Sequence, residues 1–359
     1  MCYACLRLGN ALPQHDIEDK INAGLFLCAS KKSLSLEALQ PEWDRFLEEN
    51  NYPGIETRIS FIRNIYNDFS KSEIFSFSNQ LSEGIDEETF ILSHLQQPDL
   101  FIRIRPGHKA KVITSLREQK VAFEYIEPFT LRLPNSFQAD TIAVIDKEIV
   151  VQDYSSQLTG GLMQLLKTKR DGDKKPAAGS LKVWDCCAAS GGKSIMAFDL
   201  LPGIQLTVTD IRQSILENLR KRFTVAGIKK YTSFILDLSS ASLVNNTKLY
   251  DLVIVDAPCS GSGTWGRTPE RLSFFATAEI DYYAALQKKI VANAITFLKP
   301  GGALLYITCS VFKKENEDIV GYIQRQTSAV LLKQELIEGY YTKADSMFAA
   351  LLTPAAERA

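Results

Sequence analysis

The residues best suited to chemistry are two cysteines, each placed just after a predicted buried strand. Cys259 comes soon after the apolar run Leu252–Val255, and Cys309 comes fifty residues later, after Ala303–Ile307. In an open α/β sheet, the residues just past the carboxyl ends of the strands form the ligand crevice. We therefore expect both thiols to face one substrate, with one attacking and the other assisting.

A turn of small residues follows another predicted strand, Lys182–Cys186. The turn consists of Cys187, Ala188, Ala189, Ser190, Gly191, Gly192 and Lys193. Small side chains let a ligand approach the backbone closely, and the free amides of the next helix attract it. The spacing fits neither Gly-x-Gly-x-x-Gly nor the Walker pattern, so it disfavours a dinucleotide or a nucleoside triphosphate. A tight turn without a ligand is the alternative.

Three carboxylates end three successive predicted strands: Asp210, Asp237 and Asp256. Asp210 lies about twenty residues past the small-residue turn, where an acidic residue binds ribose hydroxyls in doubly wound folds. Asp237 is placed to accept a hydrogen bond near an adenine amino group. Each aspartate alone is more often a helix cap. Together they predict an adenosine-bearing cofactor without phosphates, because carboxylates repel phosphate.

Composition places the chain among ordinary globular proteins. Its 359 residues are 45% hydrophobic and 23% charged, with a net charge of −1. The apolar runs are too short for a membrane helix and the start lacks a signal-peptide layout, so we expect a cytoplasmic protein. Seven cysteines are too few for a disulfide scaffold. The spacing of Cys2 and Cys5 relative to His15 and Cys28 matches no zinc pattern, so we expect no metal.

Charge and hydrophobic spacing divide the chain into three parts. Residues 1–95 show helical spacing, and residues 33–95 carry twelve acidic and four basic side chains. Residues 96–135 form a small predicted α+β module with seven basic and four acidic side chains. Residues 136–353 alternate strands with helices, which predicts a doubly wound parallel sheet. A basic module beside an acidic one favours steering of a nucleic acid, although a solvated charged surface explains the pattern equally well.

The motifs resemble those of the Sun/Fmu-type family of S-adenosylmethionine-dependent RNA 5-methylcytosine methyltransferases. That family's Asp-Ala-Pro-Cys-Ser-Gly is intact at Asp256–Gly261, and its Thr-Cys-Ser at Thr308–Ser310. Its Cys-Ala-Ala-Pro-Gly-Gly-Lys appears at Cys187–Lys193 with Ser190 in place of proline. Its Arg-x-Pro-Asp appears as Arg267–Glu270. The likeness covers roughly residues 96 to 353.

The resemblance implies a Rossmann-like class I methyltransferase domain, S-adenosyl-L-methionine as cofactor and RNA as partner. It implies that Cys309 adds to carbon 6 of cytosine, which makes carbon 5 nucleophilic, and that Cys259 assists removal of the carbon 5 proton. It also implies an RNA-binding segment at Arg103–Arg105. Asp256 is expected to contact the cofactor or the cytosine edge, and Lys193 to steady charge.

The expected activity is formation of 5-methylcytosine in RNA, most simply ribosomal RNA, by a cytoplasmic monomer. Two alternatives stay open: the same chemistry on tRNA, and a non-catalytic RNA-binding or ribosome-assembly protein that kept the fold. DNA cytosine methyltransferases use a Pro-Cys nucleophile without a second cysteine, so Cys309 argues against them. Thr264–Gly266 replaces a second basic residue of the family before Arg267, which leaves RNA contacts at that point open.

Overall fold

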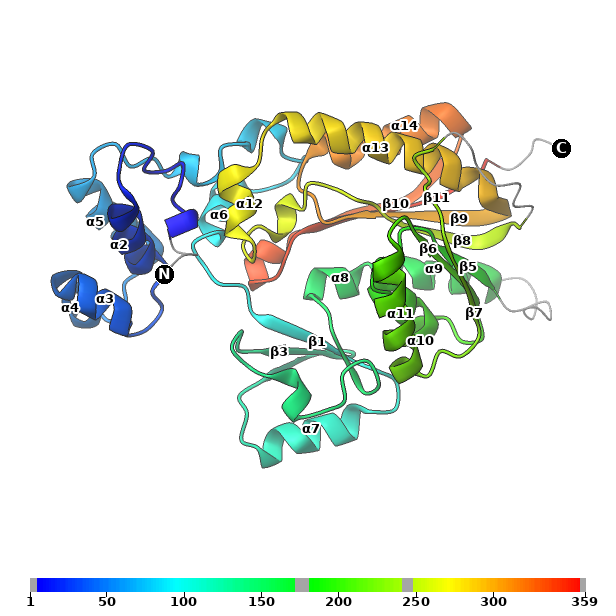
Figure 1. Cartoon of the computed structure of the whole chain (residues 1–359), viewed down its shortest axis with the longest axis horizontal. Coiled ribbons are helices and arrows are strands. Elements are labelled where there is room, and N and C mark those ends of the chain that lie inside the picture. The colour runs from blue at the N-terminus through cyan, green and yellow to red at the C-terminus, as the bar shows by residue number, and fades with distance from the viewer. Residues whose placement is uncertain (1–4, 172–180, 241–247, 356–359) are drawn as a thin grey trace.

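The structure, a computed structural model, describes residues 5–171, 181–240 and 248–355. A helical N-terminal part, a small antiparallel sheet and a larger sheet flanked by helices follow one another along the chain (Figure 1). In the view of Figure 1 the N-terminal helices lie to the left of the larger domain, and the small sheet with α7 lies below it. Among the described residues, the helices are too short or too polar to cross a bilayer.

The larger sheet has seven strands in the order β10-β11-β9-β8-β5-β6-β7. In chain order they are β5 (Lys182–Asp185), β6 (Gln205–Asp210), β7 (Tyr231–Ile235), β8 (Tyr250–Asp256), β9 (Leu298–Thr308), β10 (Val330–Ile337) and β11 (Met347–Thr353). The strands β5 to β9 run parallel to their neighbours in that group. The chain moves outward from β5 to β7 and then returns to β8 on the other side of β5. This reversal is the switch point at which doubly wound folds bind ligands.

The two closing strands differ from the predicted parallel sheet. β11 pairs antiparallel with both β9 and β10. The segment between β10 and β11 is too short for the crossover that a parallel pair needs, so the chain turns back instead. The predicted doubly wound sheet is confirmed, and the mixed edge gives it the Rossmann-like form that the resemblance implied.

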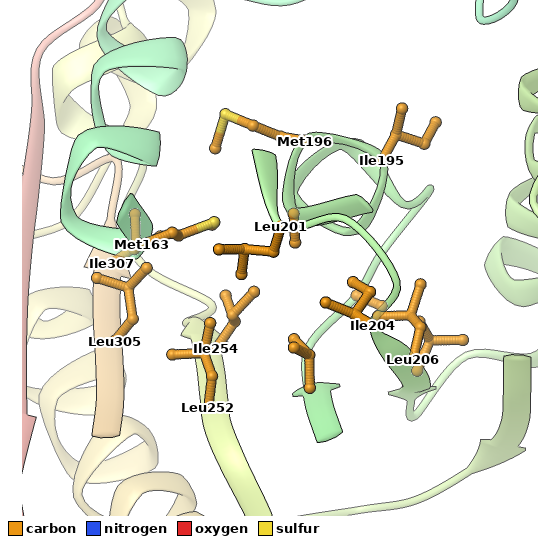
Figure 2. Packing of buried hydrophobic residues seen from close by; sticks show 14 of the residues in the cluster. Met163, Ile195, Met196, Leu201, Ile204, Leu206, Leu252, Ile254, Leu305 and Ile307 are labelled. Atoms are coloured by element: carbon orange, nitrogen blue, oxygen red, sulfur yellow. The ribbon is translucent and has the colours of Figure 1, made fainter. Parts of the chain in front are cut away.

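Alternating side chains of the central strands build a core on each face of this sheet. Leu252 and Ile254 of β8 join Leu305 and Ile307 of β9 on one face (Figure 2). The intervening residues, such as Val253, enter the core of the other face. Because both faces are covered, these strands are apolar at almost every position.

Helices cover both faces of the larger sheet. One face carries α9 (Gly160–Asp171), α10 (Gly192–Leu200) and α11 (Gln213–Ala226). The other face carries α13 (Ala278–Ala294) and α14 (Glu317–Thr327) (Figure 1). Two shorter helices, α8 (Tyr154–Leu158) and α12 (Pro269–Phe274), lie in the connections. α11 ends at Gly227, whose φ of 75° suits glycine as a helix stop.

The small sheet has the strand order β2-β3-β1-β4 and packs on one helix. Its elements are β1 (Leu100–Ile104), α7 (Lys109–Glu118), β2 (Glu124–Ile126), β3 (Thr130–Leu133) and β4 (Ile149–Val151). The predicted strands and helix of this module are therefore present. β4 pairs with β1, so the sheet extends past the predicted boundary at residue 135.

The implied RNA-binding pair, Arg103 and Arg105, is buried. The two side chains are 7% and 8% exposed, and both bind the carboxylate of Asp199 on α10, at 2.6 and 2.8 Å. An additional Arg105 hydrogen bond reaches the Ala226 carbonyl at the end of α11. These two side chains are therefore not exposed for contact with RNA, because they join the small sheet to the larger domain. RNA binding by the rest of the segment stays a prediction.

The N-terminal part is helical, as its spacing predicts. It contains α2 (Ile17–Cys28), α3 (Leu34–Leu39), α4 (Pro41–Glu49), α5 (Ile55–Ile65) and α6 (Glu87–Ser93). Its core continues into the larger domain through Trp265, whose ring lies among Phe75, Phe77 and Phe312. Trp265 is 1% exposed, so this position serves packing instead of contact with a ligand.

Candidate active site

The two predicted reactive thiols lie together. The sulfur atoms of Cys259 and Cys309 are 3.3 Å apart, and both side chains are partly exposed. Cys259 follows β8 and Cys309 follows β9, which are parallel neighbours, so both loops leave the same edge of the sheet. The expectation that one substrate can meet both thiols agrees with this geometry.

A close backbone contact holds the two cysteine loops together. The Gly263 amide donates to the Cys309 carbonyl at 2.9 Å, and the Ser346 amide donates to the Gly263 carbonyl at 2.8 Å. A Cβ at position 263 would lie 2.0 Å from the Ser346 carbonyl oxygen. Glycine is therefore required here by close approach of three chain segments.

A buried carboxylate supports both loops from beneath. Glu315 is fully buried and accepts hydrogen bonds from the Ser260 amide, the Ser310 hydroxyl and the Gln287 amide group. Gln287, on α13, also donates to the Pro258 carbonyl at 3.0 Å. Burial raises the pKa of Glu315, while these donors oppose that effect. The network fixes the residues on either side of Cys259 and the one after Cys309.

The environment of Cys259 disfavours ionisation of its thiol. The hydrogen bond to Cys309 and burial raise the pKa of the Cys259 thiol well above its usual value, and the negative charges of Cys309 and Glu315 add to the effect. A raised thiol pKa keeps the proton on sulfur at neutral pH and makes a weak nucleophile. Because the two sulfur atoms share one hydrogen bond, ionisation of either thiol affects the other.

Lys193 and Asp256 form an ion pair beside the thiols. The Lys193 Nζ lies 3.2 Å from Asp256 Oδ2 and donates to the Ser156 hydroxyl at 2.8 Å. The lysine side chain is 7% exposed and the aspartate 33%, so the carboxylate is the partner that reaches the surface. Ser156 comes from α8 and was not among the predicted site residues.

The small-residue turn wraps around the carboxylate of Asp210. Asp210 Oδ2 accepts from the Ala189 amide at 3.0 Å, and its Oδ1 accepts from the Arg212 amide and side chain.

Gly191, with φ of 87°, turns the chain into α10. A side chain at Gly191 would strike Phe223, whereas at Gly192 a Cβ meets open space.

Ser190, which stands where the family has proline, is held by an arginine from α11. Arg222 donates to the Ser190 carbonyl at 3.1 Å and to its hydroxyl at 3.0 Å. The same guanidinium binds both carboxylate oxygens of Asp146, at 2.8 and 2.7 Å. Asp146 precedes β4, so the small sheet helps to fix the turn. Sequence spacing gave no signal for this brace, because Asp146, Ser190 and Arg222 belong to three separate segments.

Asp237 lies in a tight turn of its own. Its Oδ1 accepts from the amide and the hydroxyl of Ser239, and these bonds lower the pKa of the carboxyl group. In the part of the chain that the structure describes, no hydrogen bond joins Asp237 to the small-residue turn or to Asp210 and Asp256. Its predicted cofactor contact therefore stays a prediction.

The site as a whole fits an adenosine-bearing, phosphate-free cofactor. Asp210 and Asp256 end β6 and β8, and Asp237 follows β7, all at the same edge of the sheet around the switch point between β5 and β8. Carboxylates accept hydrogen bonds from hydroxyl and amino groups and favour a positively charged ligand centre. The open space beside Gly192 leaves backbone accessible at the start of α10. These carboxylates and the accessible backbone thus fit a nucleoside that carries a positively charged sulfonium group.

The sequence motifs did not predict a role for one buried carboxyl group, which comes just before the turn. Asp185, at the end of β5, is fully buried and accepts from the Ser194 hydroxyl at 2.6 Å. Burial raises its pKa to about 7. Its place immediately before the turn, at the end of a predicted strand, was the available signal.

Arg267, in the family's Arg-x-Pro-Asp motif, joins three segments. It binds Asp345 at 2.8 Å and Asp153 at 2.7 Å, and donates to the Asp99 carbonyl.

Within the described residues, no group of three potential metal ligands is assembled. Cys2, one member of the sequence pair considered for a metal, lies outside them.

Comparison with protein families gives a match over residues 175–358 to the model described as 16S rRNA methyltransferase RsmB/F. Ribosomal RNA small subunit methyltransferase B of Xanthomonas campestris is 33% identical over 257 residues, which cover 68% of this chain and 55% of that protein. The corresponding Erwinia tasmaniensis protein is 31% identical, over 66% of this chain and 54% of that protein. The chain thus spans about half the length of these relatives.

A mouse protein named tRNA (cytosine(72)-C(5))-methyltransferase NSUN6 is 29% identical over 167 residues, 43% of this chain and 34% of that protein. Among solved structures, the crystal structure of PH0851 superposes with a TM-score of 0.70 at 22% identity, over 94% of this chain and 81% of that one. NSun6 from Pyrococcus horikoshii with SFG gives 0.64 at 14% identity, over 79% and 97%. These two structures show a shared fold.

Proposed function

The chain belongs to the 16S rRNA methyltransferase RsmB/F family, and from that premise we propose that it forms 5-methylcytosine in RNA through a thiol adduct. The observation that carries the proposal is the 3.3 Å separation of the Cys259 and Cys309 sulfur atoms. Carbons 5 and 6 of cytosine are bonded neighbours, so two thiols this close can act on them in one bound base.

Cys309 acts as the nucleophile. Its thiolate adds to carbon 6 of cytosine, and the electron pair of the 5,6 double bond makes carbon 5 an enamine carbon that attacks a methyl donor. S-adenosylmethionine supplies that methyl group as an electrophile when bound. The support for Cys309 in this role is its place in the Thr-Cys-Ser motif, Thr308–Ser310, which the family resemblance assigns to the attacking thiol.

Cys259 then assists release. Once the Cys309 sulfur is bonded to carbon 6, it no longer carries the charge that opposes ionisation of Cys259. After attack the Cys259 thiol can lose its own proton to water, and the resulting thiolate takes the carbon 5 proton. Loss of that proton restores the 5,6 double bond and expels the Cys309 thiolate. Attack by Cys309 and proton removal by Cys259 would thus use one hydrogen-bonded pair of thiols.

The cofactor would be held by the turn Cys187–Lys193 together with Asp210, Asp237 and Asp256. Support comes from the three carboxylates at this edge of the sheet, which would repel a phosphate-bearing ligand. The NSun6 structure adds to it, because it contains SFG, an S-adenosylmethionine analogue. Lys193 holds the Asp256 carboxylate and balances its charge in the crevice.

Ribosomal RNA is the proposed substrate, because the family model and the bacterial relatives bear rRNA methyltransferase names. The mouse relative is named for tRNA, which keeps tRNA as a second candidate. The target base must leave its stack to reach two thiols in a crevice, so we expect a single-stranded or flippable cytosine.

The test is methyl transfer from labelled S-adenosylmethionine to unmodified 16S rRNA and, separately, to unmodified tRNA transcripts. Nucleoside analysis should give labelled 5-methylcytosine with rRNA and much less with tRNA. Label on tRNA alone would change the substrate, and bound RNA with no label on either would support a non-catalytic RNA-binding protein.

A further inference from the structure

The N-terminal part reaches the chain just beyond Cys309. Leu81 forms an antiparallel bridge with Phe312, and the Ser82 amide donates to the Val311 carbonyl at 2.8 Å. The family match covers residues 175–358 and therefore does not include Leu81 or Ser82. A segment distant in sequence is thereby hydrogen-bonded two residues past the proposed nucleophile.

The Ser82 side chain continues the contact inside the protein. Its hydroxyl oxygen accepts from Asn316 Nδ2 at 2.9 Å, and its proton is donated to Glu317 Oε2 at 3.0 Å. Ser82 is 4% exposed and Asn316 is fully buried. Because Glu317 Oε2 accepts this proton, the hydroxyl is oriented with its lone pairs toward Asn316.

Asn316 in turn holds both neighbours of Cys309. Its Oδ1 accepts from the Thr308 hydroxyl at 2.6 Å, and its Nδ2 donates to the Ser310 carbonyl at 2.9 Å. Thr308 and Ser310 are both fully buried. A carboxamide can satisfy these two partners in one orientation only, and the acceptor at Ser82 favours that orientation.

We propose that Ser82 is a positioning residue for Cys309, and that residues 75–82 form part of the catalytic scaffold. The Ser82 hydroxyl fixes the Asn316 carboxamide, which fixes the backbone on each side of the thiol. The packing of Phe75 and Phe77 against Trp265 and Phe312 keeps this segment in place. The inference rests on the proposed function only in treating Cys309 as the nucleophile.

The experiment compares the wild type with Ser82→Ala, Ser82→Thr and a matched control, Ser93→Ala. Ser93 belongs to the same part of the chain and bonds the Phe90 carbonyl within its own helix. Two quantities are measured: the rate of Cys309 alkylation by iodoacetamide between pH 6 and pH 9, resolved from Cys259 by peptide mass spectrometry, and kcat and KM for methyl transfer.

We expect Ser82→Ala to change the Cys309 alkylation profile by about threefold or more and to lower kcat about tenfold with KM for RNA unchanged, because small displacements of a reacting group are costly. Ser82→Thr should restore both, and Ser93→Ala should match the wild type. A Ser82→Ala protein that matches Ser93→Ala in both quantities would overturn the inference.

Two further results stay interpretable. If the wild type transfers no methyl group, the proposed function fails while the alkylation comparison still tests the positioning of Cys309. If Ser82→Ala does not fold, Glu317→Gln replaces it, because the weaker amide acceptor loosens the Ser82 hydroxyl. An unchanged Cys309 profile in a folded Glu317→Gln protein would then contradict the inference.

Discussion

The Cys259 and Cys309 sulfur atoms lie 3.3 Å apart although fifty residues separate them in the chain. Each follows one of two parallel, adjacent strands, and the Gly263 amide ties the first loop to the Cys309 carbonyl. This contact makes a two-thiol reaction on one base geometrically possible.

The first prediction concerns the brace on the small-residue turn. Arg222→Ala should weaken S-adenosylmethionine binding about tenfold, because charged hydrogen bonds to Ser190 and Asp146 each contribute roughly 1.5–3 kcal/mol and their loss frees the turn. Isothermal titration calorimetry measures the affinity. Arg220→Ala, at an exposed position of the same helix, is the matched control. Equal affinities in the two variants would show that the brace does not shape the cofactor site.

The second prediction concerns the contact that joins the cysteine loops. Gly263→Ala should lower the free energy of unfolding by roughly 2 kcal/mol or more, because its Cβ would overlap the Ser346 carbonyl and force the backbone apart. Urea unfolding gives the value. Gly161→Ala, where a Cβ meets nothing within 4 Å, should be neutral or slightly stabilising. A Gly263→Ala protein as stable as Gly161→Ala would contradict the observed approach.

The third prediction concerns Asp185, whose pKa burial raises to about 7. Its folded pKa lies above the unfolded value near 3.9, so between these values the folded state binds more protons and stability falls as pH rises. Relative to Asp185→Asn, the wild type should lose about 2 kcal/mol between pH 5 and pH 7. Urea unfolding at several pH values measures both. Parallel curves for the two proteins would mean that Asp185 titrates normally.

The fourth prediction concerns Asp199, which binds two buried arginines. Asp199→Asn should destabilise the protein by about 3 kcal/mol, because Arg103 and Arg105 would keep their buried charges without a counter-ion. Thermal unfolding measures the change. At temperatures where the variant is folded, its RNA affinity should keep the wild-type salt dependence. In a folded Arg103→Ala protein, by contrast, a reduced salt slope would show that this arginine contacts RNA phosphate.

The sequence predicts the sheet and the thiols well because both follow local rules. Apolar runs mark β8 and β9, and the edge of a parallel sheet brings residues such as Cys259 and Cys309 together. Short local motifs likewise predict the small-residue turn and the aspartates at the ends of the neighbouring strands. These features need no knowledge of distant contacts.

Other features depend on contacts between segments far apart in the chain. Arg103 and Arg105 look like exposed basic residues on an alternating strand, and their burial depends on Asp199, 94 residues beyond Arg105. The link from Ser82 to Asn316 spans 234 residues. A single sequence carries no local signal for such pairs, so these partners became visible only in the folded chain.

The most direct measurement is a denaturing gel of Cys259→Ala and Cys309→Ala, each incubated with the RNA substrate and S-adenosylmethionine. We expect a denaturant-stable protein–RNA adduct with Cys259→Ala, because Cys309 can attack but release is blocked, and none with Cys309→Ala. The reverse pattern would make Cys259 the nucleophile and contradict the assigned roles. Methyl transfer by the wild type with no adduct from either variant would contradict the covalent mechanism itself.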